Sequence, residues 1–521
     1  MARMTTAARR TGIVRAALAL GAVAALAGCS LLPGLGGVRE AASPALPEAP
    51  SGSAASFSEQ DPEWQSCGDG MQCADVFAPL DWAEPAGETI TLRLVKHPAT
   101  GTERLGTLFI NPGGPGASGA GYVMDSIDRV VQPELQAAYD VIGWDPRGVG
   151  DSTPVHCLDA AEMDRFLYGD DSATAGLERG SDAWIAAALA EREGFEAACA
   201  EENGALLAHV ATSDTVQDLE MLRGIVGDPK LSYLGFSYGT YIGARYADAY
   251  PDRVGRLVLD GAMDPTATMS DVVREQTIGF EQALRAYTAD CLERRGCPLS
   301  GSVDAGMAQI SALLDRVDAQ PLRASDGRTV TSGVAVTAIV LPLYSQDMWG
   351  YLDRLFSSLA VDDPDVALAL ADAYNDRVDG VYQSNSFEAF SAINCLDYPN
   401  ESDPERMRAD AAELAEIAPT IGRFQGYGDL ACATWPVPSV AERTPVSAPG
   451  AAPILVVGTT GDPATPYRWA ESLAEQLESG HLITYVGEGH TAATTSSCVA
   501  DIVSEYLLTG AVPASDPRCT E

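Results

Sequence analysis

Basic residues are scarce in this chain of 521 residues. Lysine occurs only at Lys96 and Lys230, and 33 Lys and Arg stand against 73 Asp and Glu, which gives a formal net charge of −40 at pH 7. Proteins that bind nucleic acid or anionic lipid present a basic face to the phosphates. The charge balance therefore excludes nucleic acid as the main partner and argues against electrostatic docking on a membrane. We interpret the acidic excess as a solvated surface, with an acidic site that attracts cations as the alternative.

Motifs for metal ions and nucleotide phosphates are also missing. The sequence contains no Cys-x-x-Cys pair, no His-Glu-x-x-His and no Walker-type phosphate loop. We therefore expect neither a metal nor a cofactor. Disorder throughout is excluded as well, because 46% of the residues are hydrophobic and only 20% are charged. A chain of this length can form one large core or two to three domains.

The N-terminus lacks an apolar run long enough to span a bilayer. The apolar stretch from Ala16 to Cys29 has 14 residues, whereas a membrane-spanning helix needs roughly 20. A basic segment precedes it, and this combination indicates a secretory signal peptide over residues 1–29. The basic segment contains Arg3, Arg9, Arg10 and Arg15. Its adjacent arginine pair lacks the rest of a twin-arginine signal, so the export route stays open.

The segment Leu26-Ala27-Gly28-Cys29 resembles the lipobox of bacterial lipoproteins. The resemblance implies that Cys29 becomes the mature N-terminus and carries lipid, with an ordinary cleaved signal as the alternative. Residues 30–62 are rich in Pro, Gly, Ser and Ala without periodicity, which is typical of a flexible linker. We expect an extracytoplasmic protein, either secreted or attached to the outer face of the cytoplasmic membrane through the lipid alone.

Without Cys29 the chain has ten cysteines, an even number that can pair in an oxidising compartment. Ten cysteines allow about 945 connectivities, so the sequence alone proves none. Short loops close at the least entropic cost, and we therefore predict that neighbours along the chain pair. The predicted disulfides are Cys67–Cys73, Cys157–Cys199, Cys291–Cys297, Cys395–Cys432 and Cys498–Cys519.

From about residue 88, short apolar segments alternate with helical patterns. Such alternation predicts an α/β fold with a mostly parallel sheet that is covered by helices on both faces. Ser213 is expected to cap a helix that buries Val216, Leu219, Leu222 and Val226. The expected strands are residues 89–95, 106–110, 140–144, 231–235 and 256–260, and a further helix is expected at 238–250.

The pattern changes between residues 266 and 445, where helical periodicity dominates. Helices are expected at 272–291, 307–317, 335–359 and 404–417. Strands then resume at 453–457 and 482–486, with helices from 467 and over 499–508. We therefore predict one α/β domain, formed by residues 63–265 and 446–521, with a helical cap inserted at 266–445.

The segment Gly235-Phe236-Ser237-Tyr238-Gly239 lies between an expected strand and an expected helix. This is the context of a nucleophile elbow, in which a sharp turn exposes a serine hydroxyl above the sheet. The flanking glycines remove side chains that would clash in such a turn. We therefore predict that Ser237 is a nucleophile.

A serine hydroxyl needs a base, and the chain has five histidines, His97, His156, His209, His481 and His490. His490 directly follows the strand expected at 482–486, where a loop can reach the serine, and we predict it as the base. His481 begins that strand at its opposite end, and the other three precede the serine and are interpreted as structural. Asp462 follows the preceding strand and is the predicted orienting acid, with Asp260 as the alternative. The order serine, acid, histidine is that of α/β-hydrolases.

A tetrahedral intermediate also needs hydrogen-bond donors for its oxyanion. The glycine-rich segment Asn111-Pro112-Gly113-Gly114-Pro115-Gly116 follows the strand expected at 106–110. We predict the backbone amides of Gly114 and Tyr238 as the two donors, with Gly113 possible in place of Gly114. The pattern Gly114-x-Gly116-x-x-Gly119 also fits a dinucleotide fingerprint, an interpretation disfavoured by the prolines and by the triad elsewhere.

These motifs together resemble a known family. The oxyanion segment, Trp144-Asp145-Pro146-Arg147-Gly148, the elbow and Gly461-Asp462-Pro463-Ala464-Thr465-Pro466 are similar to those of the secreted tripeptidyl aminopeptidases of actinobacteria. These are prolyl-aminopeptidase-type serine α/β-hydrolases with a TAP-like C-terminal region. The resemblance covers roughly residues 65–520 and is weaker in the insertion. Ordinary prolyl aminopeptidases differ, since their oxyanion loop usually opens with His where Asn111 stands.

The resemblance implies a serine peptidase that cleaves short peptides near a free N-terminus, beneath a cap that limits access. An aminopeptidase must hold the substrate ammonium, and a buried carboxylate can do so. We predict Asp397, in a segment that resembles a recurring one in the family, with Asp264 as the second candidate; a structural role is the alternative for each. An exported esterase or lipase is the competing function, and a non-catalytic anchored binding protein is the remote one.

Overall fold

The computed structural model describes residues 49–520 except 51, 170–172, 175 and 401. The predicted signal peptide, Cys29 and linker residues 30–48 lie outside this part of the chain. Within it, no helix has the length and apolarity needed to cross a membrane.

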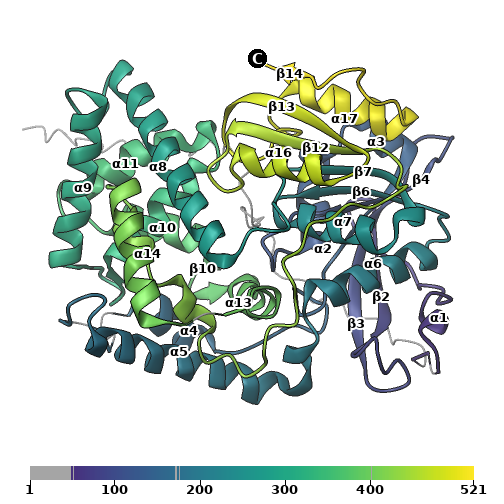
Figure 1. Cartoon of the computed structure of the whole chain (residues 1–521), viewed down its shortest axis with the longest axis horizontal. Helices are drawn as coiled ribbons and strands as arrows, with labels where there is room; N and C mark the ends of the chain where they lie inside the picture. Colours follow the sequence, from purple (N-terminus) through teal and green to yellow (C-terminus); the bar gives the residue numbers. More distant parts are fainter. Residues whose placement is uncertain (1–48, 51, 170–172, 175, 401, 521) are drawn as a thin grey trace, which may run out of the picture.

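A ten-stranded sheet forms the centre of the described chain, in the order β1-β2-β3-β5-β4-β6-β7-β12-β13-β14 (Figure 1). From β5 to β14 neighbouring strands run parallel, whereas β1, β2 and β3 form an antiparallel edge that joins β5 antiparallel. The predicted α/β class and mostly parallel sheet are therefore confirmed. The strands are β1 Gln65–Gly68, β2 Met71–Pro79, β3 Thr89–His97, β4 Gly106–Asn111, β5 Tyr139–Trp144, β6 Leu231–Phe236, β7 Val254–Asp260, β12 Ile454–Gly461, β13 Gly480–Glu488 and β14 Arg518–Cys519.

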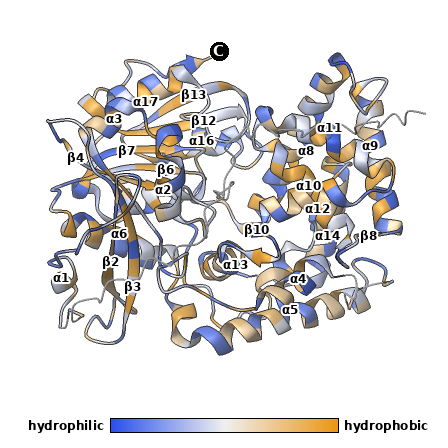
Figure 2. Ribbon diagram, turned by 180° about the vertical axis from the view of Figure 1, so that it is seen from behind, coloured by the Kyte–Doolittle hydropathy of each residue, from blue (hydrophilic) through white to orange (hydrophobic). Residues whose placement is uncertain are grey.

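Helices cover both faces of this sheet. Along β7, Leu257 and Leu259 enter the apolar cluster of one face while Val258 enters that of the other. Central strands therefore carry apolar residues toward both faces, as the orange stretches of the strands in Figure 2 show. On the first face lie α6 Thr212–Ile225, α7 Tyr238–Ala249 and α16 Tyr467–Gln476; on the second lie α2 Gly119–Val130, α3 Pro133–Ala138 and α17 Ser497–Thr509.

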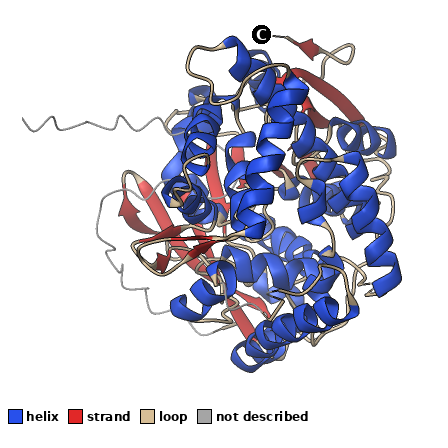
Figure 3. Ribbon diagram, turned by 90° about the vertical axis from the view of Figure 1, so that its left-hand side faces the viewer, coloured by secondary structure: helices blue, strands red, loops and turns tan. Residues whose placement is uncertain are grey.

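The segment between β7 and β12 is built mainly of helices and has an apolar cluster of its own (Figure 3). Its helices are α8 Met269–Glu293, α9 Val303–Ala319, α10 Ser332–Leu343, α11 Trp349–Leu359, α12 Asp365–Tyr374, α13 Ser386–Asp397, α14 Pro404–Ile417 and α15 Gly422–Gln425, with the 3-10 turns η3 Gln346–Met348 and η4 Gly428–Cys432. Two short ribbons accompany them, β8 Leu322–Arg323 with β9 Thr329–Val330, and β10 Arg377–Val378 with β11 Val381–Tyr382.

The helical layer also includes residues that precede Ser237 in the chain. Helices α4 (Ala160–Tyr168) and α5 (Asp182–Asn203), followed by the turn η1 (Gly204–Ala208), run alongside the insertion (Figure 1). Tyr168 joins the apolar cluster of the insertion, and Trp184 packs on Tyr427 with ring centroids 4.9 Å apart. These helices lie within the predicted 63–265 part, so in the structure the cap layer draws on two segments of the chain.

Three local predictions were wrong. The expected helix at 335–359 is interrupted, because Pro342 ends the hydrogen-bond ladder and Ser345 is extended. Ser213 is not a cap, since α6 begins at Thr212 without a side-chain cap of that kind. The folded body begins before residue 63, at α1 (Ala54–Phe57), where Phe57 is fully buried and packs edge-on against Trp82.

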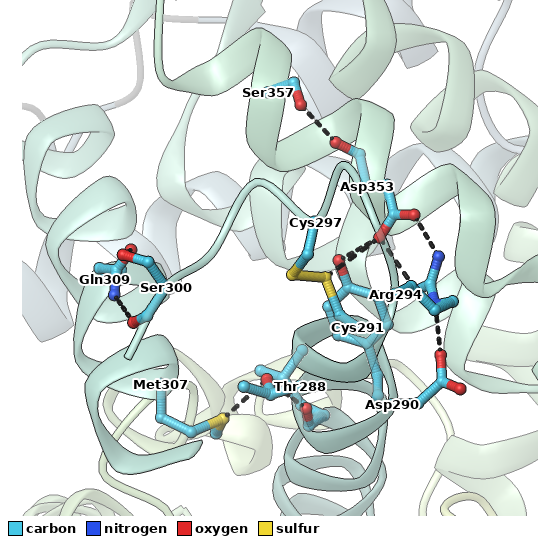
Figure 4. The surroundings of a disulfide bond; sticks show 12 residues. Thr288, Asp290, Cys291, Arg294, Cys297, Ser300, Met307, Gln309, Asp353 and Ser357 are labelled. Carbon is cyan, nitrogen blue, oxygen red and sulfur yellow. Dashed lines mark hydrogen bonds and ion pairs between the residues drawn. A yellow bond between two sulfur atoms is a disulfide. The ribbon is translucent and has the colours of Figure 1, made fainter. Parts of the chain in front are cut away.

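All five predicted cysteine pairs form disulfides in the structure, with sequence separations from 6 to 42 residues. Figure 4 shows the Cys291–Cys297 pair, which closes the turn after α8. Arg294 in this turn forms an ion pair with Asp353 of α11 at 2.5 Å. The disulfide thus fixes the turn to the end of α8, and the ion pair connects the turn to α11.

Candidate active site

Ser237 lies at the turn between β6 and α7 in a strained conformation, with φ 54° and ψ −124°. Its N–H donates to the carbonyl of Asp260 at 2.9 Å, which fixes the turn to β7. A Cβ on Gly235 would lie 2.6 Å from the Gly239 carbonyl oxygen, so only glycine fits there. A non-glycine residue at positive φ costs about 1–2 kcal/mol, and the packing on both sides maintains it.

His490 and Asp462 are in direct contact. The Nδ1 of His490 lies 3.0 and 2.9 Å from the two carboxylate oxygens of Asp462, and both side chains are buried. The Asp462 carboxylate also accepts the backbone N–H groups of Ala464 and Thr465, at 2.9 and 2.8 Å, and the Thr465 hydroxyl at 2.9 Å. These donors hold the carboxylate in place, so it orients the imidazole.

The imidazole lies beside the nucleophile turn. Gly261 directly follows the residue that binds the Ser237 amide, and a Cβ on Gly261 would lie 3.1 Å from Cε1 of His490. Among the described residues no hydrogen bond joins Ser237 Oγ to His490, and such bonds are often long without substrate. The helix break after α10 places Tyr344 against His490. The Tyr344 carbonyl accepts the backbone N–H of His490 at 2.8 Å, and the phenol ring packs edge-on against the imidazole with ring centroids 5.4 Å apart.

Two carboxylates determine the basicity of His490. Burial alone would lower the pKa of the imidazole, but Asp462, through charge and hydrogen bonding, and Asp260, through charge, raise it above its ordinary value. A raised pKa favours the imidazolium that forms when the serine proton is transferred. The site is therefore electrostatically suited to general base catalysis.

Asp260, the alternative acid, has a different place. It is fully buried at the end of β7, and its carboxylate accepts the N–H of Ala492 at 3.0 Å and that of Ala493 at 2.8 Å. Burial raises the pKa of this carboxyl to about 6. Asp260 thus connects the nucleophile turn, through its carbonyl, with the chain that follows His490, through its carboxylate. This double contact was not foreseen from the sequence.

The glycine-rich segment packs directly on the nucleophile turn. A Cβ on Gly113 would lie 2.5 Å from the Phe236 carbonyl oxygen and 2.7 Å from the Tyr238 nitrogen. The Gly113 N–H already donates to the Asn111 Oδ1 at 2.9 Å. This bond leaves Gly114 as the better candidate of the two for an oxyanion donor beside Tyr238.

Helix α13 covers the same segment. A Cβ on Gly116 would lie 2.7 Å from the Ser386 carbonyl oxygen and 2.9 Å from the Phe390 nitrogen. The Asn385 side chain fixes the start of α13 by donating to the carbonyls of Gly148 and Val155 at 2.8 and 2.9 Å. The backbone of α13 therefore occupies the space that a dinucleotide would need at Gly116.

Asp397, the predicted amine ligand, has other partners. It is buried, and its carboxylate accepts the Thr212 N–H at 2.9 Å and the Tyr238 hydroxyl. It therefore caps the N-terminus of α6, where an anion is favourable, in place of the expected Ser213. Burial raises the pKa of Asp397 although these donors oppose the shift. Both oxygens are engaged, so the structure assigns Asp397 a structural contact.

Asp264 is similarly engaged. Its Oδ1 accepts the N–H and hydroxyl of Thr266 at 2.9 and 2.7 Å and the side-chain amide of Gln476 at 2.9 Å. Despite burial, these hydrogen bonds lower the pKa of the carboxyl. Asp264 thus fixes the loop after β7 to α16.

A cavity of about 1430 Å³ lies within the cap layer and is bounded by α4, α5, α8 and α10. Its wall includes Tyr344, which packs on His490, so the cavity lies next to the site. The remaining histidines lie elsewhere: His97 and His481 on β3 and β13, His156 and His209 in loops. No group of three or more His, Cys, Asp or Glu that could hold a metal occurs in the described part of the chain.

Comparison with known proteins gives two family matches. Residues 106–335 match the family described as alpha/beta hydrolase fold, and residues 418–519 match the family described as TAP-like protein. The middle part of the predicted cap, residues 336–417, lies outside both matches.

Curated relatives match over most of the chain. The serine protease Hip1 of Mycobacterium tuberculosis is 37% identical over 463 residues, covering 86% of this chain and 87% of that protein. Carboxylesterase B of the same species is 34% identical over 460 residues, covering 86% of each chain. The tripeptidyl aminopeptidase of Streptomyces lividans is 30% identical over 478 residues, covering 88% of this chain and 86% of that protein.

Proposed function

This chain belongs to the TAP-like family of α/β-hydrolases and is a serine hydrolase, and we propose on that basis that it is an exported exopeptidase. It cleaves short peptides near a free N-terminus through Ser237, His490 and Asp462. The observation that supports this best is the pairing of the strained Ser237 turn with the buried contact between His490 and Asp462 at 2.9 Å.

The reaction begins when the Ser237 Oγ attacks the carbonyl carbon of the scissile peptide bond. The hydroxyl proton passes to Nε2 of His490, while Asp462 stabilises the imidazolium. The backbone amides of Gly114 and Tyr238 donate to the oxyanion of the tetrahedral intermediate.

Collapse of this intermediate breaks the C–N bond. His490 gives its proton to the leaving nitrogen, and the acyl group remains on Ser237 as an ester. Water then attacks the ester and gives a proton to His490, which returns it to Ser237 as the carboxylic product leaves. The chemistry needs only these side chains and water.

Access through the helical cap limits the substrate to short peptides. The cavity of about 1430 Å³ beside Tyr344 is larger than the usual 300–1,000 Å³ of a small-molecule pocket and can accommodate several residues. Since Asp397 and Asp264 have structural partners, we do not assign them the substrate amine.

Export is supported by the five disulfides, which persist in oxidising compartments. We propose that the protein acts outside the cytoplasm, held by lipid on Cys29 at the outer face of the cytoplasmic membrane. Detergent-phase partitioning of the full chain tests the anchor.

The test of the activity compares Ala-Ala-Ala-aminomethylcoumarin with its N-acetylated form, Ala-aminomethylcoumarin and p-nitrophenyl butyrate. We expect the free tripeptide to be cleaved with a kcat/KM at least about tenfold above that of the acetylated form. Fluorophosphonate labelling of the wild type and of Ser237→Ala serves as the control for the nucleophile. Equal cleavage of free and acetylated peptides would contradict an exopeptidase.

An esterase is the second candidate function, and the similarity to Carboxylesterase B supports it. The same three side chains cleave esters by the same steps. Turnover of p-nitrophenyl butyrate without turnover of any peptide would favour the esterase.

A further inference from the structure

Arg192 of α5 lines the cap cavity, and no described residue provides it with a counter-ion at contact distance. We propose that Arg192 forms a carboxylate-binding subsite in the cavity, which selects peptides that carry a negative charge away from the scissile bond. The inference rests on the proposed function, because it concerns the part of a peptide that reaches into the cap.

The guanidinium of Arg192 is oriented by an aromatic ring. Its Cζ lies 5.0 Å from the centroid of Phe166, which also lines the cavity. No carboxylate oxygen of the described residues lies within 4.0 Å of its nitrogens. Glu191, on the cavity wall, and Glu196 act on it only through longer-range charge.

Neighbouring arginines behave differently. Arg377 forms a bidentate pair with Asp164 at 2.7 Å, and Arg328 pairs with Asp326 at 2.8 Å. With 73 acidic against 33 basic residues, the chain has ample carboxylates for such pairs. Arg179, which also lines the cavity, has no carboxylate at contact distance either, but it donates to the carbonyls of Phe424 and Gly426, whereas no hydrogen bond of Arg192 occurs among the described residues.

Burial of this cation is unfavourable unless a ligand compensates it. Desolvation lowers the pKa of Arg192, although arginine stays charged at any physiological pH. A carboxylate fits the guanidinium with two parallel hydrogen bonds, which are about twice as strong as neutral ones. A substrate carboxylate would thus provide the ion pair that no described residue forms with Arg192.

The wall of this cavity extends from Arg192 to Tyr344, which contacts the proposed base. Tyr344 forms part of the cavity wall and contacts the His490 ring, whereas α5 runs below α13 and apart from α10 (Figures 1 and 2). A peptide bound at Ser237 can therefore extend from Tyr344 toward Arg192. The carboxylate comes either from an acidic side chain or from the peptide C-terminus, and the geometry at Arg192 is suited to both.

The experiment measures kcat/KM for matched substrates on the full chain. One arm compares Ala-Ala-Ala-aminomethylcoumarin with its Glu-Ala-Ala and Ala-Glu-Ala analogues, and a second compares tetra-alanine with its C-terminal amide. A third arm compares p-nitrophenyl butyrate with mono-p-nitrophenyl glutarate, so that the subsite is tested even if no peptide is cleaved. The variant is Arg192→Met, with Arg165→Met, an exposed arginine of α4, as the matched control.

We expect the wild type to favour the carboxylate substrate about tenfold or more in at least one arm. Arg192→Met should abolish this preference while neutral substrates keep their kcat/KM within about twofold, and Arg165→Met should retain it. Arg192→Lys keeps the positive charge but loses the planar guanidinium that can donate two parallel hydrogen bonds. Its preference for carboxylate substrates should lie between that of the wild type and that of Arg192→Met, which provides a test if the Met variant does not fold.

The first arm identifies an acidic side chain as the ligand and the second identifies the C-terminus. Absence of any preference in all three arms would overturn the subsite, as would an equal loss for neutral and acidic substrates in Arg192→Met. Failure of peptide cleavage alone would overturn only the proposed function, because the ester arm still reports on Arg192.

Discussion

Replacing Asp260 by Asn tests whether this buried carboxylate positions His490, the proposed base. The Asp260 carboxylate accepts hydrogen bonds from the backbone N–H groups of Ala492 and Ala493, and the backbone carbonyl of Asp260 accepts one from the N–H of Ser237. Asn keeps the size but has one acceptor oxygen, and its NH₂ group would face an N–H group. The substitution therefore breaks the contact to the histidine loop and leaves the serine contact unchanged.

The expected cost follows from the contacts. A hydrogen bond to a charged group contributes about 1.5–3 kcal/mol, and a buried N–H left unpaired costs about 1–3 kcal/mol. We expect Asp260→Asn to lower the free energy of unfolding by about 2–4 kcal/mol at pH 7.5. A displacement of His490 by about 1 Å would lower kcat about 100-fold, with little change in KM.

The pH profile separates positioning from mere stability. Asp260 also raises the pKa of His490 through its charge, so in Asp260→Asn the ascending limb of kcat/KM should move to lower pH. In the wild type the Asp260 pKa is raised from 3.8 to about 6. Its contribution to stability is thus present below about pH 4 and is lost as pH rises through about 6, a dependence that the Asn variant should lack.

Chemical denaturation and steady-state kinetics between pH 5 and 9 provide the assay, with the exposed Asp252→Asn as the matched control. Reduced stability with unchanged kcat and an unchanged pH profile would refute the positioning role. Wild-type stability in Asp260→Asn would refute the contact argument itself.

Three further predictions concern the base, the core and the anchor. Because the pKa of His490 is raised, kcat/KM should increase with pH around an apparent pKa above 6.5, and Asp462→Ala should lower both that pKa and the rate, as pH–rate profiles will measure. Arg147→Met should lower the free energy of unfolding, measured with urea, by about 3–5 kcal/mol, because it leaves the buried Asp218 without the arginine that lies 2.6 Å away. The double variant Arg147→Met with Asp218→Leu should recover much of this stability. Cys29→Ser should move the protein from the membrane fraction to the soluble fraction, whereas an unchanged distribution would contradict lipid anchoring.

Local signals in the sequence predict the candidate site and seven of the ten strands of the sheet, but not the strands β1, β2 and β14 at its two edges. The strand before Ser237 and the one before His490 each contain a short, largely apolar run followed by a glycine, Gly235 and Gly487, and helices cover both faces of the sheet. The cysteine pairs follow from loop-closure entropy, which favours neighbours along the chain. Each of these signals depends on residues close together in sequence.

The errors concern contacts between distant segments. Asp397 caps α6 by accepting the Thr212 N–H, 185 residues away, so neither its role nor the failure of Ser213 as a cap is encoded locally. The helices α4 and α5 pack with the cap because its apolar surface continues onto them, which no periodicity reveals. Tyr344 reaches His490 only because the chain turns after Pro342.

The order of the strands has a consequence for biogenesis. Strands β7 and β12 pair in register, Ile454 with Leu257, although the whole cap is synthesised between them. A chain that emerges from its N-terminus must therefore keep the β7 edge open until residue 454 arrives, and such long-range pairing is slow and prone to aggregation. Ser237 is made early, whereas the proposed acid Asp462 and the proposed base His490 follow β12 and β13. A nascent chain that has not yet reached residue 490 therefore lacks the proposed base and poses no hydrolytic hazard to the cell that makes it.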